Sequence, residues 1–158
     1  KERKHIHAIQ YIHAKKNIEN TPNHKRLLEH LAHLNHAEAQ YDLAFMFEKE
    51  GDIDNSVKLY KKAAYQDHTE AKYRLAKLVV EPDFWFSKAA LDGHREAKYE
   101  MGKILEVKYN NGGILNFNFK KDEQIKEQAI KWYLSAAQQG HQEAAEKYKV
   151  LTGLQAKL

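Results

Sequence analysis

The phrase HAEAQYDLAFMF at residues 36–47 decides the fold, because variants of it return three more times along the chain. The later copies are HTEAKYRLAKLV at 68–79, HREAKYEMGKIL at 94–105 and HQEAAEKYKVL at 141–151. Apolar and small residues three and four positions apart mark each copy as an amphipathic helix. A unit that recurs in this way can bury its apolar face only against its neighbours. We therefore expect an all-α fold of stacked helical units.

A second helical phrase lies between the copies of the first. Its three copies are VKLYKKAAYQD at 57–67, FWFSKAALDG at 84–93 and AIKWYLSAAQQG at 129–140. Two helical phrases joined by a short link form an antiparallel helix hairpin, and the chain repeats such hairpins.

The first full unit gives the boundaries of the two helices. We expect a first helix at about 37–49 and a second at about 56–66. Gly51 stands where a helix C-terminus favours a left-handed residue. Asp54 or Asn55 can then cap the second helix through a side-chain oxygen.

Small residues stand at the positions where the two helices of a unit would touch. They are Ala39, Ala71 and Ala97 in the first helices, and Ala63/Ala64, Ala89/Ala90 and Ala136/Ala137 in the second. A methyl side chain lets two helix axes approach closely. Tyr41, Tyr73 and Tyr99 follow the first-helix alanines by two residues, and we expect them to pack in the stack with a partner for each hydroxyl.

The combined pattern, Ala-x-Tyr-x-Leu-Ala/Gly in the first helix and Trp-Tyr-x-x-Ala-Ala-x-x-Gly-His in the second, resembles the Sel-one-like repeat (SLR) family, a relative of tetratricopeptide repeats. The stretch at 129–141 carries the second pattern most fully, and the resemblance covers about residues 36–153. It implies a right-handed α-α superhelix, that is, a solenoid of antiparallel helix hairpins.

The spacing of the repeats predicts one helical-repeat domain over residues 1–158. Its expected parts are a degenerate N-terminal helix pair that acts as a cap at 1–35, repeats at 36–67, 68–93 and 94–140, and a capping helix with a tail at 141–158. In the N-terminal part we expect helices at about 5–16 and 25–34, divided by a turn at 20–23. The second repeat has almost no linker, with Pro82 and Asp83 opening its second helix.

The third repeat carries an insertion at about 108–121. Its turn formers, Asn110 to Gly113, are followed by alternating aromatic and polar residues, so we expect a loop that Phe117 and Phe119 tether. Two hypotheses stay open: the phenylalanines seal the gap between units, or they project as a partner contact.

Charge and composition narrow the function classes. The net charge is +4, but residues 1–35 hold seven Lys/Arg against three Asp/Glu, while residues 36–158 hold nineteen of each. A nucleic-acid binder usually has a basic stripe across its folded surface, so we expect no nucleic-acid partner, although a short basic arm stays open. No apolar run reaches the roughly 20 residues of a membrane span. The absence of cysteine excludes disulfides and thiolate sites.

The histidines raise the question of a metal site. Four of the ten stand just before a first helix, at His36, His68, His94 and His141, and we interpret them as caps or packing groups at the hairpin junction. His30 and His33, with Glu29 beside them, could face one ion, but no HExxH or two-histidine-one-carboxylate pattern accompanies them, so solvated side chains are the preferred interpretation. We expect no metal and no cofactor.

No catalytic motif is present either: there is no GxSxG, no phosphate-binding glycine loop and no cysteine. The sequence therefore predicts a protein that is not an enzyme, with no catalytic residue.

In tetratricopeptide-like solenoids the first helices line the concave face, and the resemblance carries this expectation over. The residues expected in that groove are Glu38, Tyr41, Asp42, Phe45, Tyr73, Arg74, Lys77, Tyr99, Glu100 and Lys103. Aromatic anchors with charges of both signs suit a peptide or protein segment. The leading hypothesis is a non-enzymatic protein–protein interaction scaffold.

The alternative function, also taken from the resemblance, is a bacterial immunity or inhibitor protein that neutralises a cognate toxin, or a secreted virulence factor. The family resemblance also favours the bacterial periplasm or secretion slightly over the cytoplasm. The oligomeric state and the identity of the partner stay open.

Overall fold

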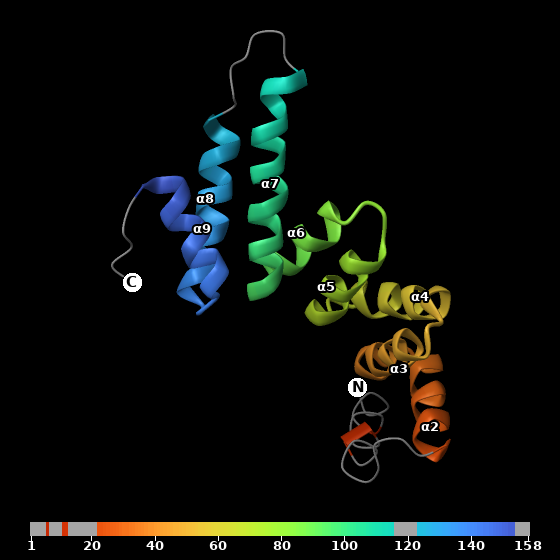
Figure 1. Ribbon diagram of the computed structural model, residues 1–158. Coiled ribbons are helices and arrows are strands. Elements are labelled where there is room, and N and C mark those ends of the chain that lie inside the picture. Colours follow the sequence, from red (N-terminus) through yellow and green to blue (C-terminus); the bar gives the residue numbers. More distant parts are fainter. Residues whose placement is uncertain (1–5, 7–10, 13–21, 116–122, 154–158) are drawn as a thin grey trace. The chain divides into compact units, whose positions relative to one another are not determined.

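The computed structural model describes residues 6, 11–12, 22–115 and 123–153, and every element in these ranges is a helix (Figure 1). The helices are α2 (Pro22–His33), α3 (Ala37–Glu50), α4 (Ile53–Ala64), α5 (Thr69–Leu78), α6 (Asp83–Leu91), α7 (Arg95–Leu115), α8 (Glu123–Gln138) and α9 (Gln142–Thr152). The expected all-α class is confirmed. None of these helices is long and apolar enough to cross a membrane.

The chain divides into two compact units, residues 1–80 and 81–158. In unit 1, α3 and α4 form a hairpin, α2 packs on α3, and α5 packs on α4. In unit 2, α7 and α8 lie side by side and antiparallel, with α6 against α7 and α9 against α8 (Figure 1).

A histidine caps the first helix at each copy of the repeated phrase. Its Nδ1 accepts a hydrogen bond from the backbone N–H three residues later, and the four pairs are His36–Ala39, His68–Ala71, His94–Ala97 and His141–Ala144. These bonds are 3.1–3.3 Å long. The cap interpretation of these histidines is thus confirmed, because each ring satisfies a backbone donor that the first helical turn leaves open.

A left-handed residue precedes each capping histidine and ends the helix before it. The four are Asn35, Asp67, Gly93 and Gly140, with φ between 62° and 95°. In each case the histidine N–H donates to the carbonyl five residues back, as His68 does to Ala63 at 3.2 Å. This is the Schellman geometry of a helix C-terminus, so one short link closes one helix and caps the next.

The predicted alanines form the contact surface between the helices. Ala39, Ala71 and Ala97 are fully buried, and the alanine pairs of α4, α6 and α8 are at most 7% exposed. One core cluster of unit 1 joins α2 to α3 through Leu28, Leu31 and Leu43. The corresponding cluster of unit 2 joins α8 to α9 around Tyr133.

The link between α3 and α4 corrects one sequence prediction. Gly51 is left-handed at φ 82°, as expected, and closes α3. The cap of α4 is Asp52, whose Oδ1 accepts from the Asn55 N–H at 3.2 Å, and not Asp54 or Asn55. Because Gly51 reverses the chain in a single residue, α4 begins three residues earlier than expected, at Ile53.

The described part of the insertion in the third repeat, residues 108–115, is helical, which corrects the loop prediction for these residues. Helix α7 runs without a break to Leu115. The helix continues through the Asn-Asn-Gly-Gly stretch despite its poor helix propensity, and Tyr109 just before it contacts α8: its hydroxyl donates to Glu123 at 3.0 Å, and the Lys126 ammonium lies 5.8 Å from the centre of its ring. Phe117 and Phe119 lie outside the described residues.

The second N-terminal helix also begins earlier than predicted. Pro22 begins α2 instead of belonging to a turn at 20–23. Proline suits the first helical position, where its missing N–H would have no intrahelical partner. Most of the helix predicted at 5–16 lies outside the described residues.

Candidate partner-binding face

The structure brings together the site residues that the sequence places in unit 1. Helices α3 and α5 carry Glu38, Tyr41, Asp42 and Phe45, and Tyr73, Arg74 and Lys77. The start of α5 lies beside the start of α3, because His68 Nε2 is 3.2 Å from Glu38 Oε2. Further along, the Arg74 guanidinium lies 5.0 Å from the centre of the Phe45 ring. We call the surface of these two helices the α3–α5 face.

Two residues of this face hold the unit together. The Tyr41 ring stacks on His68, with centroids 4.6 Å apart and planes inclined by 16°. Asp42 accepts a 2.6 Å hydrogen bond from the Tyr11 hydroxyl. The tyrosine is thus a packing group as expected, and Asp42 ties the N-terminal part of the chain to α3.

Two aromatic rings of the face are half-buried and make cation–π contacts. The Phe45 ring contacts both Arg74 and Lys49, and the Lys49 Nζ is 5.2 Å from the centre of the ring. The Tyr73 ring has Lys77 at 5.7 Å. Lys49 is not among the site residues predicted from the sequence, although its position four residues after Phe45, on the same helix face, indicates the contact.

The remaining predicted site residues lie in unit 2, on α7. The Lys103 ammonium is 5.1 Å from the centre of the Tyr99 ring and 2.7 Å from Glu100. Tyr99 stacks on His141 at 4.3 Å, as Tyr41 does on His68. In each unit, therefore, an aromatic ring is contacted by the ammonium group of the lysine that stands four residues after it in the sequence.

Behind the α3–α5 face, a tyrosine of α4 joins α3 and α5 through a carboxylate. Tyr60 is fully buried, and its hydroxyl donates to Glu48 Oε2 at 2.6 Å. The other oxygen of Glu48 lies 3.6 Å from Arg74 Nη1. Three successive helices are thus linked by one polar cluster.

Unit 2 repeats this cluster on α7, α8 and α9. The hydroxyl of the fully buried Tyr133 donates to Glu106 Oε2 at 2.6 Å, and Lys147 Nζ is 3.0 Å from Glu106 Oε1. We call the two clusters the carboxylate–tyrosine latches.

Neither latch is among the contacts predicted from the sequence, although the chain contains a signal for them. In the α5–α6 sequence, Val80 stands where the other repeats have the glutamate and Phe86 where they have the buried tyrosine. The acceptor and the donor are replaced together. That joint replacement points to a hydrogen bond between the two positions.

Burial and hydrogen bonding shift the pKa values of the latches. Burial, followed by the hydrogen bond to Glu48, raises the pKa of the Tyr60 hydroxyl far above its ordinary value. The same two causes, with Glu106 as acceptor, raise the pKa of Tyr133. Burial alone would raise the pKa of Glu106, but the hydrogen bonds from Tyr133 and Lys147 outweigh it and lower that pKa. The tyrosines therefore stay neutral donors and Glu106 stays an ionised acceptor at neutral pH.

Two solved structures share this arrangement of helices. A Sel1 repeat protein from Oxalobacter formigenes matches 90% of this chain at 26% sequence identity and a TM-score of 0.68. The protein c5321, a protective antigen present in uropathogenic Escherichia coli strains and displaying an SLR fold, matches 94% of it at 20% identity and a TM-score of 0.67. The chain has a Sel1-like repeat fold. It spans 60% and 33% of the length of these two proteins. No protein-family model and no curated protein matches the sequence.

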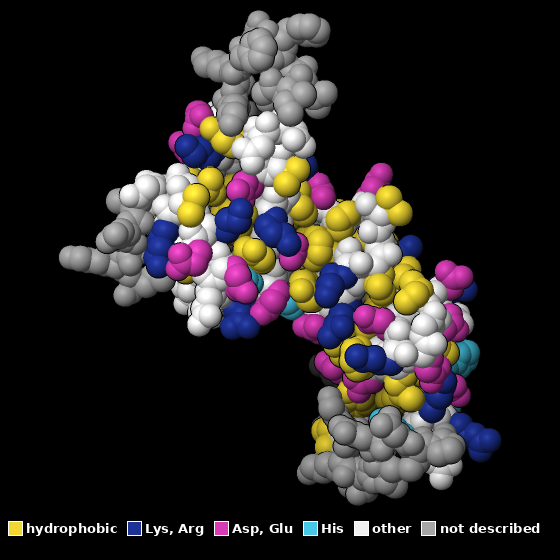
Figure 2. All heavy atoms as spheres, in the orientation of Figure 1, with side chains coloured by type: hydrophobic (Ala, Val, Ile, Leu, Met, Phe, Trp, Pro, Cys, Tyr) yellow, Lys and Arg dark blue, Asp and Glu magenta, His cyan; other side chains and the backbone are white. Residues whose placement is uncertain are grey.

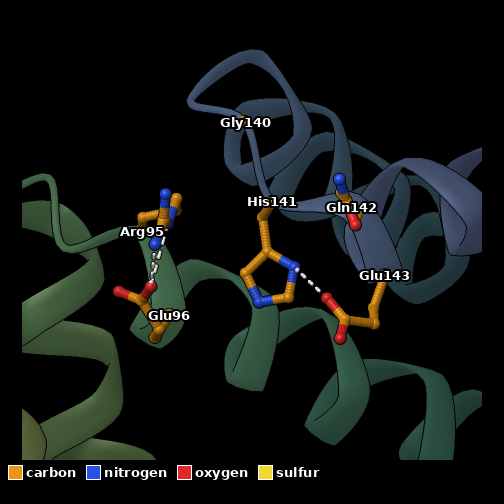
Figure 3. Close-up of a pocket in the computed structure, with 6 residues that line it drawn as sticks. All are labelled: Arg95, Glu96, Gly140, His141, Gln142 and Glu143. Atoms are coloured by element: carbon orange, nitrogen blue, oxygen red, sulfur yellow. Dashed lines mark hydrogen bonds and ion pairs between the residues drawn. The ribbon is translucent and has the colours of Figure 1, made fainter.

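A polar cavity of about 250 Å³ lies in unit 2 of this Sel1-like repeat chain, between the starts of α7 and α9. Its lining residues are Arg95, Glu96, Gly140, His141, Gln142 and Glu143. Figure 3 shows the Arg95–Glu96 pair on one side and the His141–Glu143 pair on the other. Arg95 neutralises Glu96 inside the cavity, and Glu143 lies beside the imidazole of His141.

No metal-binding cluster of three or more His, Asp or Glu side chains occurs in the described part of the chain. His30 and His33 are exposed on α2. On the side of the molecule drawn in Figure 2, Lys and Arg side chains are intermixed with Asp and Glu in each unit, with hydrophobic side chains between them.

Proposed function

We propose that this Sel1-like repeat chain is a non-enzymatic interaction scaffold that binds a peptide or protein segment on the concave face lined by its first helices. The observation that carries the proposal is the pair of cation-covered, half-buried rings of Phe45 and Tyr73 on the α3–α5 face. Aromatic rings that are held in place and still partly accessible supply the buried area of an interface at little cost in side-chain entropy.

The contacts behind the face support this proposal, because they hold Tyr41 and Arg74 in place before a partner arrives. Tyr41 is held by its stack on His68, and Arg74 by Glu48 and Glu70 at 3.6 and 3.4 Å. A surface held in this way loses little conformational entropy when a partner docks. Tyr99, Glu100 and Lys103 would form the corresponding surface in unit 2.

Site-specific photocrosslinking tests the proposal. A benzophenone amino acid is introduced at Phe45 in one variant, and at Tyr65, which is 76% exposed at the end of α4, in a matched control. We expect a discrete crosslinked partner from position 45 in extracts of the source organism and none from position 65. The same partner captured equally from both positions would contradict the proposed face.

The inhibitor hypothesis stays a prediction of the sequence resemblance. It requires a tight one-to-one complex with a single enzyme whose activity is lost on binding. The crosslinking experiment would reveal such an enzyme as the partner.

A further inference from the structure

We infer that the segment bound on the α3–α5 face is acidic, with carboxylates that bind the ammonium groups of Lys49 and Lys77 and an apolar neighbour that rests on Phe45 or Tyr73. The inference rests on the proposed function and names the chemistry of its partner. It follows from the two charged groups of the face that have no hydrogen-bond or ion-pair partner among the described residues.

The carboxylates of α3 and α5 are already engaged within unit 1. Their donors are His68 for Glu38, Tyr11 for Asp42, Tyr60 and Arg74 for Glu48, Lys25 for Glu50, and Arg74 for Glu70. The distances run from 2.6 to 3.6 Å. Each carboxylate of the face therefore already has a donor within the folded unit.

Lys49 and Lys77 differ from these residues. Both ammonium groups are exposed, and among the described residues each has an aromatic ring beneath it but no carboxylate within ion-pair distance. A ring beneath an ammonium leaves its N–H donors open to a further acceptor. Among the described residues of the face, these two ammonium groups are therefore the charged groups that have no hydrogen-bond or ion-pair partner.

The rings determine what must accompany the acidic group. Lys49 lies four residues after Phe45, and Lys77 four residues after Tyr73, so on each helix the cation is adjacent to an apolar surface. A carboxylate that binds the ammonium brings the next residue of its chain over that ring. An acidic residue beside an aromatic or aliphatic one fits this pairing, and we commit to Asp or Glu side chains within a chain as the source of the carboxylate.

A lysine in the last turn of a helix stabilises that helix through the helix dipole, and Lys49 and Lys77 both stand in the last turn of their helix. The experiment therefore needs control lysines at the same position of another helix. Lys61 and Lys62 occupy the last turn of α4 in the same way and are exposed, but neither has a ring contact within the described part of the chain. They provide a matched control, because reversing their charge changes the net charge of the protein by the same amount on another helix.

The experiment is a selection of random twelve-residue peptides displayed on phage against the immobilised full chain. We expect the recovered peptides to be enriched in Asp or Glu next to an aromatic or aliphatic residue. The Lys49→Glu, Lys77→Glu double variant should bind them about tenfold more weakly or worse. The Lys61→Glu, Lys62→Glu variant should bind them as the wild type does, and circular dichroism verifies that both variants are folded.

The selection separates this inference from the proposed function. Recovered peptides without acidic enrichment, or acidic peptides that bind the Lys49→Glu, Lys77→Glu variant normally, would overturn the inference. If the Phe45→Ala variant still binds the recovered peptides more weakly than the wild type does, the proposed function stands. If no peptide responds to Phe45→Ala or to the lysine reversals, or none is enriched over blank beads, both proposals fail. Peptides held only through a free C-terminal carboxylate would lose binding on amidation, and that result would also overturn the choice of Asp or Glu side chains.

Discussion

The hairpins α3–α4 of unit 1 and α7–α8 of unit 2 have the same core and different lengths. Both bury a tyrosine completely, Tyr60 or Tyr133, and both give its hydroxyl a carboxylate at 2.6 Å. Helices α3 and α4 have 14 and 12 residues, whereas α7 and α8 have 21 and 16. The additional residues of the third repeat thus lengthen its helices beyond a core that stays the same.

The two hairpins also differ at one small residue. Ala44 is fully buried in α3, and the equivalent position of α7 is Gly102. A Cβ built on Gly102 would lie 2.6 Å from the Tyr133 ring, well inside van der Waals contact. The α7–α8 hairpin is therefore so closely packed here that it excludes even a methyl group.

The largest effect is expected from Gly102→Ala. The new methyl group meets a buried ring that cannot move aside, so the free energy of unfolding should fall by about 2 kcal/mol, net of the better helix propensity of alanine. Urea denaturation followed by circular dichroism measures the loss. The reverse change in unit 1, Ala44→Gly, should cost about 1 kcal/mol through helix propensity and lost packing. If the Gly102→Ala protein were as stable as the wild type, the α7–α8 hairpin would have room for a methyl group, as the α3–α4 hairpin has at Ala44.

Removing a latch hydroxyl should have the next largest effect. Tyr60→Phe and Tyr133→Phe each leave a partly buried glutamate without its short hydrogen bond, at a cost of about 1–2 kcal/mol. A double-mutant cycle of Tyr133→Phe with Glu106→Gln should give a smaller loss than the sum of the single variants, because both remove the same bond. Strictly additive losses would mean that the latch carries no coupling.

The histidine caps should contribute equally in the two units. His68→Ala and His141→Ala each remove the acceptor for one backbone N–H, so we expect each to lower the free energy of unfolding by about 1 kcal/mol. His68→Asn, which keeps a capping oxygen, should recover most of the loss. An asparagine variant no better than the alanine variant would assign the effect to the stack on Tyr41 instead.

The smallest effect concerns acid stability in unit 2. The pKa of Glu106 is lower in the folded protein than its ordinary value of 4.5, so the unfolded chain binds a proton at a higher pH than the folded one. The contribution of Glu106 is therefore complete above about pH 4.5 and is lost as the pH falls through its folded pKa. Glu106→Gln should flatten the decline in melting temperature below pH 4.5, and an unchanged pH profile would contradict the shift.

Repetition made the small and capping residues predictable. Ala39, Ala71 and Ala97 stand at one repeat position, and the four histidines at another, so each copy supports the interpretation of the others. The cap at Asp52 was not predictable in the same way, because Asp52, Asp54 and Asn55 all offer a capping oxygen within one turn.

Contacts between helices explain the other differences from the sequence prediction. The residues at 110–113 have low helix propensity, and the contacts of the neighbouring Tyr109 with α8 cannot be predicted from the local sequence pattern. The latches join Glu48 to Tyr60 and Glu106 to Tyr133, which are 12 and 27 positions apart in the sequence. The periodicity of a single helix does not predict contacts between residues so far apart.

The assignment of the α3–α5 face as the binding surface can be tested most directly by calorimetric titration of a selected acidic peptide into the wild type, Phe45→Ala and Tyr65→Ala. If the α3–α5 face binds the partner, the Kd of Phe45→Ala should rise about tenfold or more, and that of Tyr65→Ala should equal the wild-type value. An unchanged Kd for Phe45→Ala, or a comparable rise for Tyr65→Ala, would contradict the assignment of the first helices as the binding surface.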